Sequence, residues 1–273
     1  MTTTTSPRTR FATSADGTEI AYEVQGSGPA LVLVDGALCH RAMGPSRPLA
    51  KELAASFTVY AYDRRGRGDS GPGASPYAVD REVEDLLAVI QAAGGTAHVL
   101  GASSGAALAL EAARQAAPIE RLAAYEAPFI VDDTHPANDP GLPHRLQDMV
   151  DAGRRGDAVR TFLRTVGAPA PFVALMRFMP AWKKLVAAAH TLPYDLSIVI
   201  AHQQGKPLPD GYYARVVPQT LVIAGGKSPA YMHNAQAAIA EAVPAGRVEI
   251  LAGQTHMIKA KVLAPAVTRF FVG

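Results

Sequence analysis

Short runs of consecutive apolar residues alternate along the chain with segments in which apolar residues recur every three or four positions. The short runs are typical of strands buried on both faces, and the periodic segments are typical of amphipathic helices. Predicted strands cover residues 11–14, 19–25, 30–34, 58–62, 97–100, 122–125, 220–224 and 247–251. Predicted helices cover residues 48–55, 79–92, 106–116, 230–243 and 263–271. This alternation predicts an α/β fold with a mostly parallel, doubly wound sheet.

The first two predicted strands differ from the rest because only a short turn separates them. They meet at Asp16-Gly17, a dipeptide that favours a tight hairpin when alternating residues flank it. We therefore expect the chain to open with an antiparallel pair.

The alternation of strands and helices stops between residues 130 and 218. This stretch begins with Pro136, Pro140 and Pro143 and then shows amphipathic helical patterns near 146–166 and 172–189. We predict a core formed by residues 1–129 and 219–273, with residues 130–218 as a helical lid or cap insertion over one edge of the sheet. No stretch runs apolar for the roughly 18 residues that a membrane-spanning helix requires.

The composition narrows the class of partner. The chain has 273 residues, 48% of them hydrophobic, and a formal net charge of +2, as is usual for a globular protein with one sizeable core. Arg and Lys are scattered and form no basic stripe of the kind that binds nucleic acid. We expect a small-molecule substrate, with neither nucleic acid nor a membrane as partner. The oligomeric state stays open.

The sequence also gives little support for a metal or cofactor. Its single cysteine, Cys39, cannot form an internal disulfide, and only His40 lies beside it as a further ligand. A Gly-x-Gly-x-x-Gly pattern at 66–71 follows a strand, but prolines follow where a nucleotide-binding helix should begin. The Thr-rich first ten residues lack the apolar stretch of a secretory signal. We therefore expect a cytoplasmic protein without metal or cofactor.

The strongest chemical signal is Gly-Ala-Ser-Ser-Gly at 101–105, directly after a predicted strand and before a predicted helix. A Gly-x-Ser-x-Gly pattern is common, but a nucleophile elbow requires this strand–turn–helix context. The glycines permit the crowded turn that pushes a serine hydroxyl out of the sheet. Ser103 is therefore the candidate nucleophile.

A serine hydroxyl is a weak nucleophile until a neighbouring base takes its proton. His256 follows the last predicted strand and precedes the final helix, at the edge of the sheet where the elbow also opens. We take His256 as the candidate general base. The other histidines are expected to be solvated or hydrogen-bonded; they are His40, His98, His135, His144, His190, His202 and His233.

With these motifs the sequence resembles the α/β-hydrolase superfamily over most of its length, the insertion excepted. Residues 63–70 read Asp-Arg-Arg-Gly-Arg-Gly-Asp-Ser and are similar to the family's D-x-R-G-x-G-x-S turn. Asp35-Gly36-Ala37 stands where the family usually has His-Gly-x, so Asp35 is a departure. The resemblance implies that the N–H groups of Ala37 and Ser104 form the oxyanion hole.

The family's usual place for the catalytic acid holds no carboxylate, because residues 225–228 read Gly-Gly-Lys-Ser. Some family members, including certain haloalkane dehalogenases and zearalenone-type lactonases, carry a Glu after the preceding strand instead. Tyr-Glu-Ala-Pro at 125–128 matches that position. The resemblance therefore implies that Glu126 orients His256. Asp132 and Asp133, further along the same segment, remain alternatives.

Apolar residues of the insertion offer a candidate substrate pocket. Met176 and Trp182 lie near helical spacing, and Phe129 follows the candidate acid. Helices inserted above an elbow have one face toward the sheet and one toward the cavity, so these side chains fit either a core or a pocket wall. We assign Phe129, Met176 and Trp182 to the pocket.

The resemblance implies a serine hydrolase that cleaves an ester or lactone bond of a moderately hydrophobic small molecule through an acyl-enzyme. The likeness to lactonases rests on the serine elbow, the glycine-containing oxyanion loop and Glu126 occurring together. A dehalogenase would need an aspartate in place of Ser103. Fold does not fix reaction, so a cofactor-free lyase, a cyclase, a carbon–carbon bond hydrolase and a binding module without turnover stay open.

Overall fold

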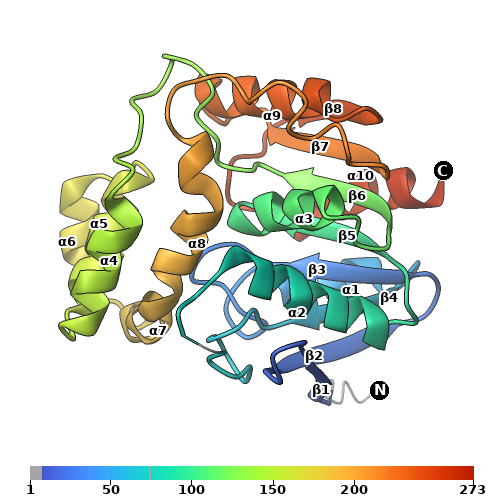
Figure 1. Ribbon diagram of the computed structural model, residues 1–273, viewed down its shortest axis with the longest axis horizontal. Helices are drawn as coiled ribbons and strands as arrows, with labels where there is room; N and C mark the ends of the chain where they lie inside the picture. The colour runs from blue at the N-terminus through green and yellow to red at the C-terminus, as the bar shows by residue number, and fades with distance from the viewer. Residues whose placement is uncertain (1–7, 74) are drawn as a thin grey trace.

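The structure, a computed structural model, describes residues 8–73 and 75–273. Within these residues an eight-stranded sheet has the order β1-β2-β4-β3-β5-β6-β7-β8 (Figure 1). The strands are β1 (Arg10–Thr13), β2 (Glu19–Gly26), β3 (Ala30–Val34), β4 (Thr58–Tyr62), β5 (Ala97–Ala102), β6 (Ile119–Tyr125), β7 (Gln219–Gly225) and β8 (Gly246–Leu251). β2 pairs antiparallel with β1 and with β4, and the other pairs are parallel. The predicted mostly parallel α/β sheet and its opening hairpin are confirmed.

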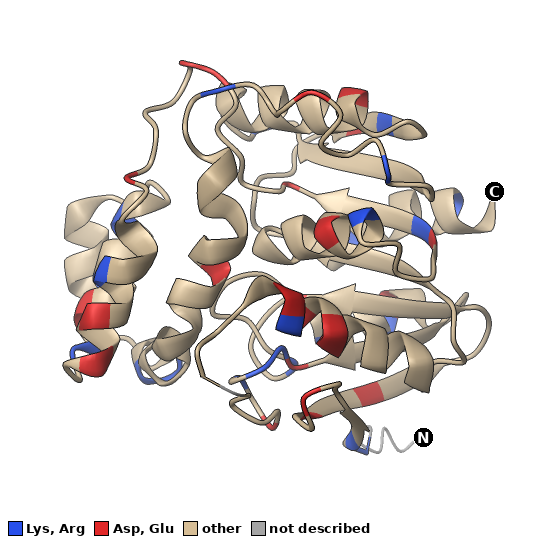
Figure 2. Ribbon diagram, in the orientation of Figure 1, with Lys and Arg blue, Asp and Glu red and all other residues tan. Residues whose placement is uncertain are grey.

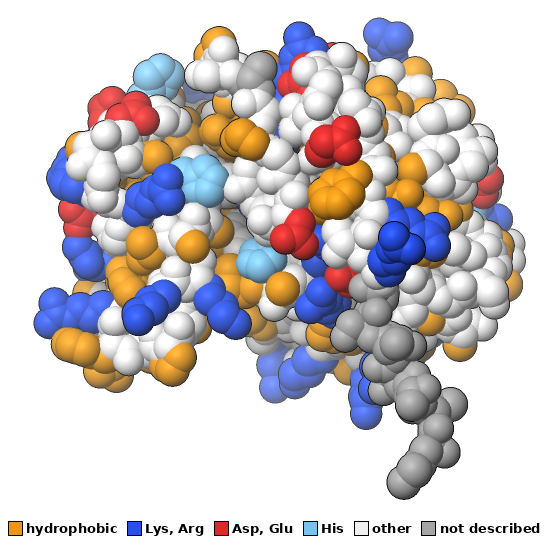
Figure 3. Space-filling view, turned by 90° about the horizontal axis from the view of Figure 1, so that it is seen from below, with side chains coloured by type: hydrophobic (Ala, Val, Ile, Leu, Met, Phe, Trp, Pro, Cys, Tyr) orange, Lys and Arg blue, Asp and Glu red, His pale blue; other side chains and the backbone are white. Residues whose placement is uncertain are grey.

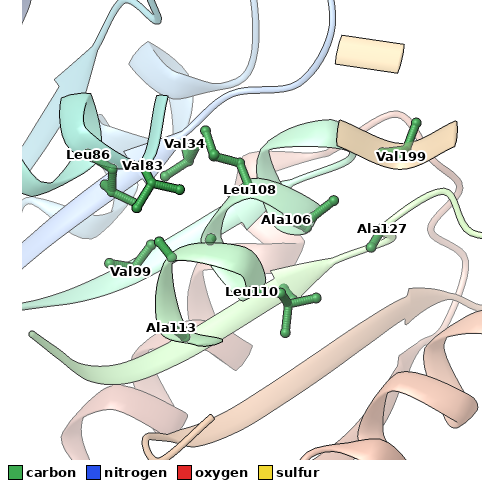
Figure 4. Close-up of a cluster of buried hydrophobic side chains, with 14 of the residues drawn as sticks. Val34, Val83, Leu86, Val99, Ala106, Leu108, Leu110, Ala113, Ala127 and Val199 are labelled. Carbon is green, nitrogen blue, oxygen red and sulfur yellow. The ribbon is translucent and has the colours of Figure 1, made fainter. Parts of the chain in front are cut away.

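Helices cover both faces of this sheet. Those that follow the core strands are α1 (Ser46–Leu53), α2 (Val79–Ala92), α3 (Ser104–Arg114), α9 (Ala230–Ala242) and α10 (Ala260–Val272). Leu31 and Leu33 of β3 pack in a buried cluster with α1 and α10, whereas Val32 and Val34 pack in the cluster that includes α2, α3 and α9. Successive residues of a strand point to opposite faces, so one apolar run fills two cores. Figure 4 shows the second cluster.

The parallel register brings the carboxyl ends of the central strands to one edge. Val34 of β3 is paired with Gly101 of β5. Ala102 is paired with Tyr125 of β6, and Tyr125 with Ile223 of β7. The loops that leave β3, β5, β6 and β7 therefore begin side by side, which is where ligands bind in open α/β sheets.

The residues between β6 and β7 contain the predicted helical insertion, here residues 130–218. Its helices are α4 (Leu142–Asp151), α5 (Arg155–Thr165), α6 (Ala170–Met176), α7 (Ala181–Ala188) and α8 (Leu192–Val199), with short 3₁₀ helices η1 (Ala189–Thr191) and η2 (Ile200–His202) on either side of α8. The helix predicted at 146–166 is instead two helices, because the chain turns at Gly153 with φ +72°. The helix predicted at 172–189 is likewise divided, and Pro180 immediately precedes α7.

The sequence pattern did not predict α8, which lies between the sheet and the other helices of the insertion (Figure 1). Its eight residues include Pro193 near the start, where proline suits the first turn of a helix rather than breaking it. Leu192, Leu196 and Val199 are buried in the core cluster, and Asp195 is buried with them. α8 is therefore the part of the insertion that is built into the core.

Contrary to the expectation from the sequence, one stretch passes the length and composition test for a membrane-spanning helix, namely the helical turns from Ala181 to His202. Of the most apolar window in this stretch, 50% is buried inside the molecule. Core helices of folded proteins give the same signal, so burial accounts for the apolar character of α8 and the turns beside it.

We predict that Leu86→Ala lowers the free energy of unfolding by about 2–5 kcal/mol, because Leu86 of α2 is fully buried in the cluster of Figure 4 and its truncation leaves a cavity. Val217→Ala is the control, since Val217 is 84% exposed and should change the same quantity by less than about 0.5 kcal/mol. Urea unfolding measures both. Equal effects of the two substitutions would contradict the assignment of this core.

Candidate active site

Ser103 occupies a strained turn between β5 and α3. Its backbone has φ +55° and ψ −126°, a region that a residue with a side chain rarely adopts, and its N–H donates to the Tyr125 carbonyl at 2.8 Å. Such a turn at the end of a strand places the serine hydroxyl at the edge of the sheet. The local structure is that of a nucleophile elbow.

The glycines around Ser103 allow three segments to touch. A Cβ on Gly101 would lie 2.5 Å from the Gly105 carbonyl oxygen, and one on Gly105 would lie 2.6 Å from the Asp35 carbonyl oxygen. A Cβ on Gly36 would lie 2.9 Å from the Ser103 Cβ. No side chain fits at these positions, so the glycines permit β5, α3 and the loop after β3 to meet around the serine.

His256 reaches the serine from the loop after β8. Its Nε2 lies 3.1 Å from Ser103 Oγ, and its Nδ1 lies 2.8 Å from Glu126 Oε2. The Tyr125 hydroxyl donates to the Thr255 carbonyl at 2.6 Å and so fixes the loop next to the histidine. The His256 side chain is 44% exposed, so the site is open to solvent on this side.

Glu126 completes the contact chain at the end of β6. It is fully buried, and its Oε1 accepts hydrogen bonds from the Gly225 N–H at 2.6 Å and the Ser228 hydroxyl at 2.5 Å. Burial by itself raises the pKa of the Glu126 carboxyl. The hydrogen bonds from His256, Ser228 and Gly225 outweigh it and hold that pKa below its usual 4.5. Glu126 is therefore an anion aimed at the histidine.

Sequence reasoning missed the role of Gly225 and Ser228. The segment after β7, which lacks the family's usual carboxylate, instead supplies donors to the carboxylate of Glu126. The absent carboxylate was itself a signal, because small or hydroxyl side chains leave room for an acid arriving from β6. The two alternative acids lie elsewhere: Asp132 accepts hydrogen bonds from Thr134 and Asn234, and Asp133 is exposed.

The expected oxyanion loop lies against the nucleophile. Gly36 approaches Ser103 so closely that a Cβ on it would lie 3.5 Å from the serine Oγ, and Ala37 follows directly. The other expected donor, Ser104, is the first residue of α3, so its N–H has no partner within the helix. Ala37 and Ser104 are thus chain neighbours of residues that touch or carry the nucleophile, and their role as oxyanion donors stays a prediction.

Asp35, which replaces the family's usual histidine, is a buried carboxyl at the start of this loop. Within the described residues its Oδ2 has no hydrogen-bond partner. Burial raises the pKa of Asp35 to about 6, although the nearby Arg67 opposes this shift.

Its neighbour Cys39 also lies in this environment, where burial raises the pKa of the thiol to about 12. Cys39 therefore stays a neutral thiol at physiological pH.

The three predicted pocket residues have different surroundings. Phe129 is fully buried, packs against the tilted His202 ring with 4.6 Å between the ring centroids, and lines a hollow with Val79 and Tyr212. Trp182 packs inside the insertion, with its indole near Gly156 of α5. Met176 is partly exposed at the end of α6. Their assignment to the pocket stays a prediction. In the described part of the chain, no group of three or more His, Cys, Asp or Glu is arranged to hold a metal ion.

We predict that Asp35→Asn stabilises the protein more at pH 8 than at pH 5. The raised pKa means that the folded state holds the Asp35 proton more tightly than the unfolded state, so the wild type loses stability as pH rises from about 4 through about 6. Asparagine does not ionise, and its advantage should grow by about 1–2 kcal/mol between these pH values. Urea unfolding at both pH values measures this. An advantage that is constant or shrinks toward pH 8 would contradict it.

A family model and several solved structures are similar to this chain over most of its length. A family model described as the alpha/beta hydrolase family matches residues 31–265. The crystal structure of an alpha/beta hydrolase from Sphaerobacter thermophilus DSM 20745 matches 96% of this chain and 100% of that one, with 46% identity and a TM-score of 0.87. The enol-lactonase of Burkholderia xenovorans LB400 is 20% identical over 96% of this chain and 98% of its own, with a TM-score of 0.65, and so shares the fold alone.

A curated relative gives a shorter match. N-formylmaleamate deformylase of Pseudomonas putida is 34% identical over 165 residues, which are 56% of this chain and 58% of that protein. The match therefore spans little more than half of the relative. The family model and the Sphaerobacter structure cover nearly all of the chain, and the sequence resemblance is confirmed. This chain belongs to the alpha/beta hydrolase family.

Proposed function

We propose that this protein is a serine hydrolase that cleaves an ester or lactone bond of a moderately hydrophobic small molecule through an acyl-enzyme. The observation that carries the proposal is the unbroken contact chain from Ser103 Oγ through His256 to the buried Glu126 carboxylate. A serine, a histidine and a buried carboxylate in this order are the parts that activate a hydroxyl nucleophile.

In the acylation step, Ser103 Oγ attacks the substrate carbonyl carbon while His256 Nε2 takes the hydroxyl proton. The imidazolium that forms is stabilised by Glu126, which stays ionised and holds the Nδ1 proton. The carbonyl oxygen becomes an oxyanion, and the N–H groups of Ala37 and Ser104 donate to it. When the carbon–oxygen bond of the ester breaks, His256 returns the proton to the leaving alkoxide.

Deacylation repeats these steps with water as the nucleophile. His256 takes a proton from the water, whose oxygen attacks the acyl carbon, and then gives the proton back to Ser103 Oγ as the acid product leaves. The His256 side chain is 44% exposed, so solvent is in contact with the residue that activates the water.

The apolar character of the insertion supports a moderately hydrophobic substrate. We propose that residues 130–218 form the lid over the site. Phe172, Leu175 and Phe178 are 50%, 62% and 71% exposed on α6 and the turn after it. At the left of Figure 3, where the insertion lies, apolar side chains alternate with Lys and Arg. Substrates that bury apolar surface would gain from such a lid.

A second bond class follows from one relative. The similarity to N-formylmaleamate deformylase favours an N-formyl compound as an alternative substrate, which the same acyl-enzyme chemistry would accommodate. Because fold does not fix reaction, the competing functions are those of a cofactor-free lyase, a cyclase, a carbon–carbon bond hydrolase and a binding protein. Acylation of Ser103 separates the hydrolase from a lyase, a cyclase and a binding protein.

We predict that an alkyl fluorophosphonate adds once to the wild-type protein and does not add to Ser103→Ala. Glu126→Gln should be labelled, but its rate should fall by about 10³–10⁴-fold, because the amide cannot stabilise the imidazolium or hold the correct tautomer. Intact-mass spectrometry over time measures all three, and a panel of p-nitrophenyl esters, lactones and N-formyl compounds then identifies the bond.

The control is Asp133→Asn, because Asp133 is an exposed carboxylate in the segment that follows Glu126. Its labelling rate should equal that of the wild type. A folded wild-type protein that takes up no probe would argue against an activated serine, and turnover by Ser103→Ala would point to a lyase or another acid–base reaction.

A further inference from the structure

A group of buried charges joins α8 of the insertion to the loop after β4. Asp195 Oδ2 accepts a hydrogen bond from Arg67 Nη2 at 2.6 Å, and its Oδ1 accepts one from Arg64 Nη1 at 2.7 Å. The side chains of all three residues are 1% exposed. Asp195 is the acidic residue in the first turn of α8, and Figure 2 shows acidic colour on that helix. The triad chemistry makes no use of these charges.

The charges in this group balance. Arg64 also donates to both oxygens of Glu82, at 2.6 and 2.7 Å, so that two guanidinium groups face two carboxylates. Burial raises the pKa of Asp195, but Arg67 and Arg64 outweigh burial and hold that pKa below its usual value. Removing one partner of a buried ion pair strongly destabilises the folded protein, because the other charge stays buried and unpaired. Asp195 thus fixes where the two guanidinium groups lie.

Arg67 in turn holds the oxyanion loop. Its Nη1 donates to the Gly36 carbonyl at 2.7 Å and to the Cys39 carbonyl at 3.3 Å. The Gly36 carbonyl and the Ala37 N–H belong to one planar peptide unit and point in opposite directions. Fixing the carbonyl therefore fixes the amide, and a charge-assisted hydrogen bond to the carbonyl polarises the peptide and strengthens its N–H as a donor.

The same carboxylate reaches the second donor. The Ser104 hydroxyl donates to Asp195 Oδ1 at 2.7 Å, and Arg64 Nη1 lies 3.2 Å from the Ser104 Oγ. Ser104 is the residue whose backbone N–H the proposed function uses. One side chain from the insertion therefore contacts groups on both sides of the oxyanion hole.

We propose that Asp195 and Arg67 are positioning residues of the oxyanion hole. Asp195 orients Arg67 and Ser104, and Arg67 aligns and polarises the Gly36–Ala37 peptide. This inference rests on the proposed function and assigns α8 a fixed place in the active site. Arg67 Nε also donates to Thr191 at 3.0 Å, and His190 Nε2 lies 2.8 Å from the Gly66 carbonyl oxygen.

The test compares Asp195→Asn with the wild type in p-nitrophenyl ester hydrolysis and in inhibition by an aryl boronic acid. The boronate adduct on a serine carries an oxygen in the oxyanion hole, so it reports donor alignment directly. We expect kcat to fall about 10- to 100-fold, KM to change by less than about threefold, and the boronate Ki to rise by the factor that kcat/KM loses. Arg67→Lys keeps a charge but lacks the planar fork, and should act in the same direction.

The matched control is Asp85→Asn. Asp85 is a buried carboxylate of α2 that accepts two hydrogen bonds, at 2.6 and 2.7 Å, from Arg65 in the loop after β4. The other hydrogen bonds of Arg65 go to Asp16 and to the Arg81 carbonyl rather than to the oxyanion loop. The Asp85→Asn variant should unfold at a lower urea concentration than the wild type and keep the wild-type kcat and boronate Ki.

Unchanged kcat and boronate Ki in folded Asp195→Asn and Arg67→Lys, or equal losses in Asp85→Asn, would overturn the positioning role while leaving the hydrolase intact. A folded wild-type protein that neither hydrolyses esters nor binds the boronate would instead overturn the proposed function and, with it, this inference. If Asp195→Asn does not fold, Arg67→Lys decides the question with the same two readouts.

Discussion

The site depends on the close approach of three backbone segments around Ser103. β5 ends, α3 begins and the loop after β3 passes at distances that leave no room for a Cβ on Gly36, Gly101 or Gly105. This crowding holds Ser103 at φ +55° against its own conformational preference. The strain is sustained because the apolar runs of the parallel sheet are buried on both faces and fix where each strand ends. The Ser103 hydroxyl and the His256 ring then meet at one edge of the sheet.

Two buried carboxylates lie near this edge of the sheet. Neither of them is on β5, the strand that ends at the nucleophile. Glu126 is kept ionised by hydrogen bonds from the segment after β7 and faces the histidine. Asp195 is kept ionised by two guanidinium groups, and one of these, Arg67, donates to the Gly36 carbonyl of the oxyanion loop. Each burial would be costly alone, and each is offset by charged or hydrogen-bonding partners that the fold brings from distant parts of the chain.

How much could be predicted from the sequence follows from how local each signal is. Strands such as β3 and β4 were predicted to the residue because a buried parallel strand is a continuous apolar run. The turn at Ser103 was predicted because its motif is five residues long and lies between a strand and a helix. The sequence pattern did not predict α8, because a short apolar run that contains a proline is also typical of a loop or a strand. The role of Asp195 was not predicted, because its partner Arg67 lies 128 residues away in the sequence. The pattern of apolar residues alone does not say whether Phe129 and Trp182 belong to a pocket wall or to a core, because either setting selects the same residue types.

The central claim is that substrate carbon becomes bonded to Ser103 Oγ. The most direct measurement is rapid acid quenching during turnover of a p-nitrophenyl ester, followed by mass spectrometry of the digested protein. The account predicts an acyl group on the peptide that contains Ser103, formed at a rate no slower than kcat and absent from Ser103→Ala. Steady turnover with Ser103 unmodified at every quench time, and with Ser103→Ala equally active, would contradict it.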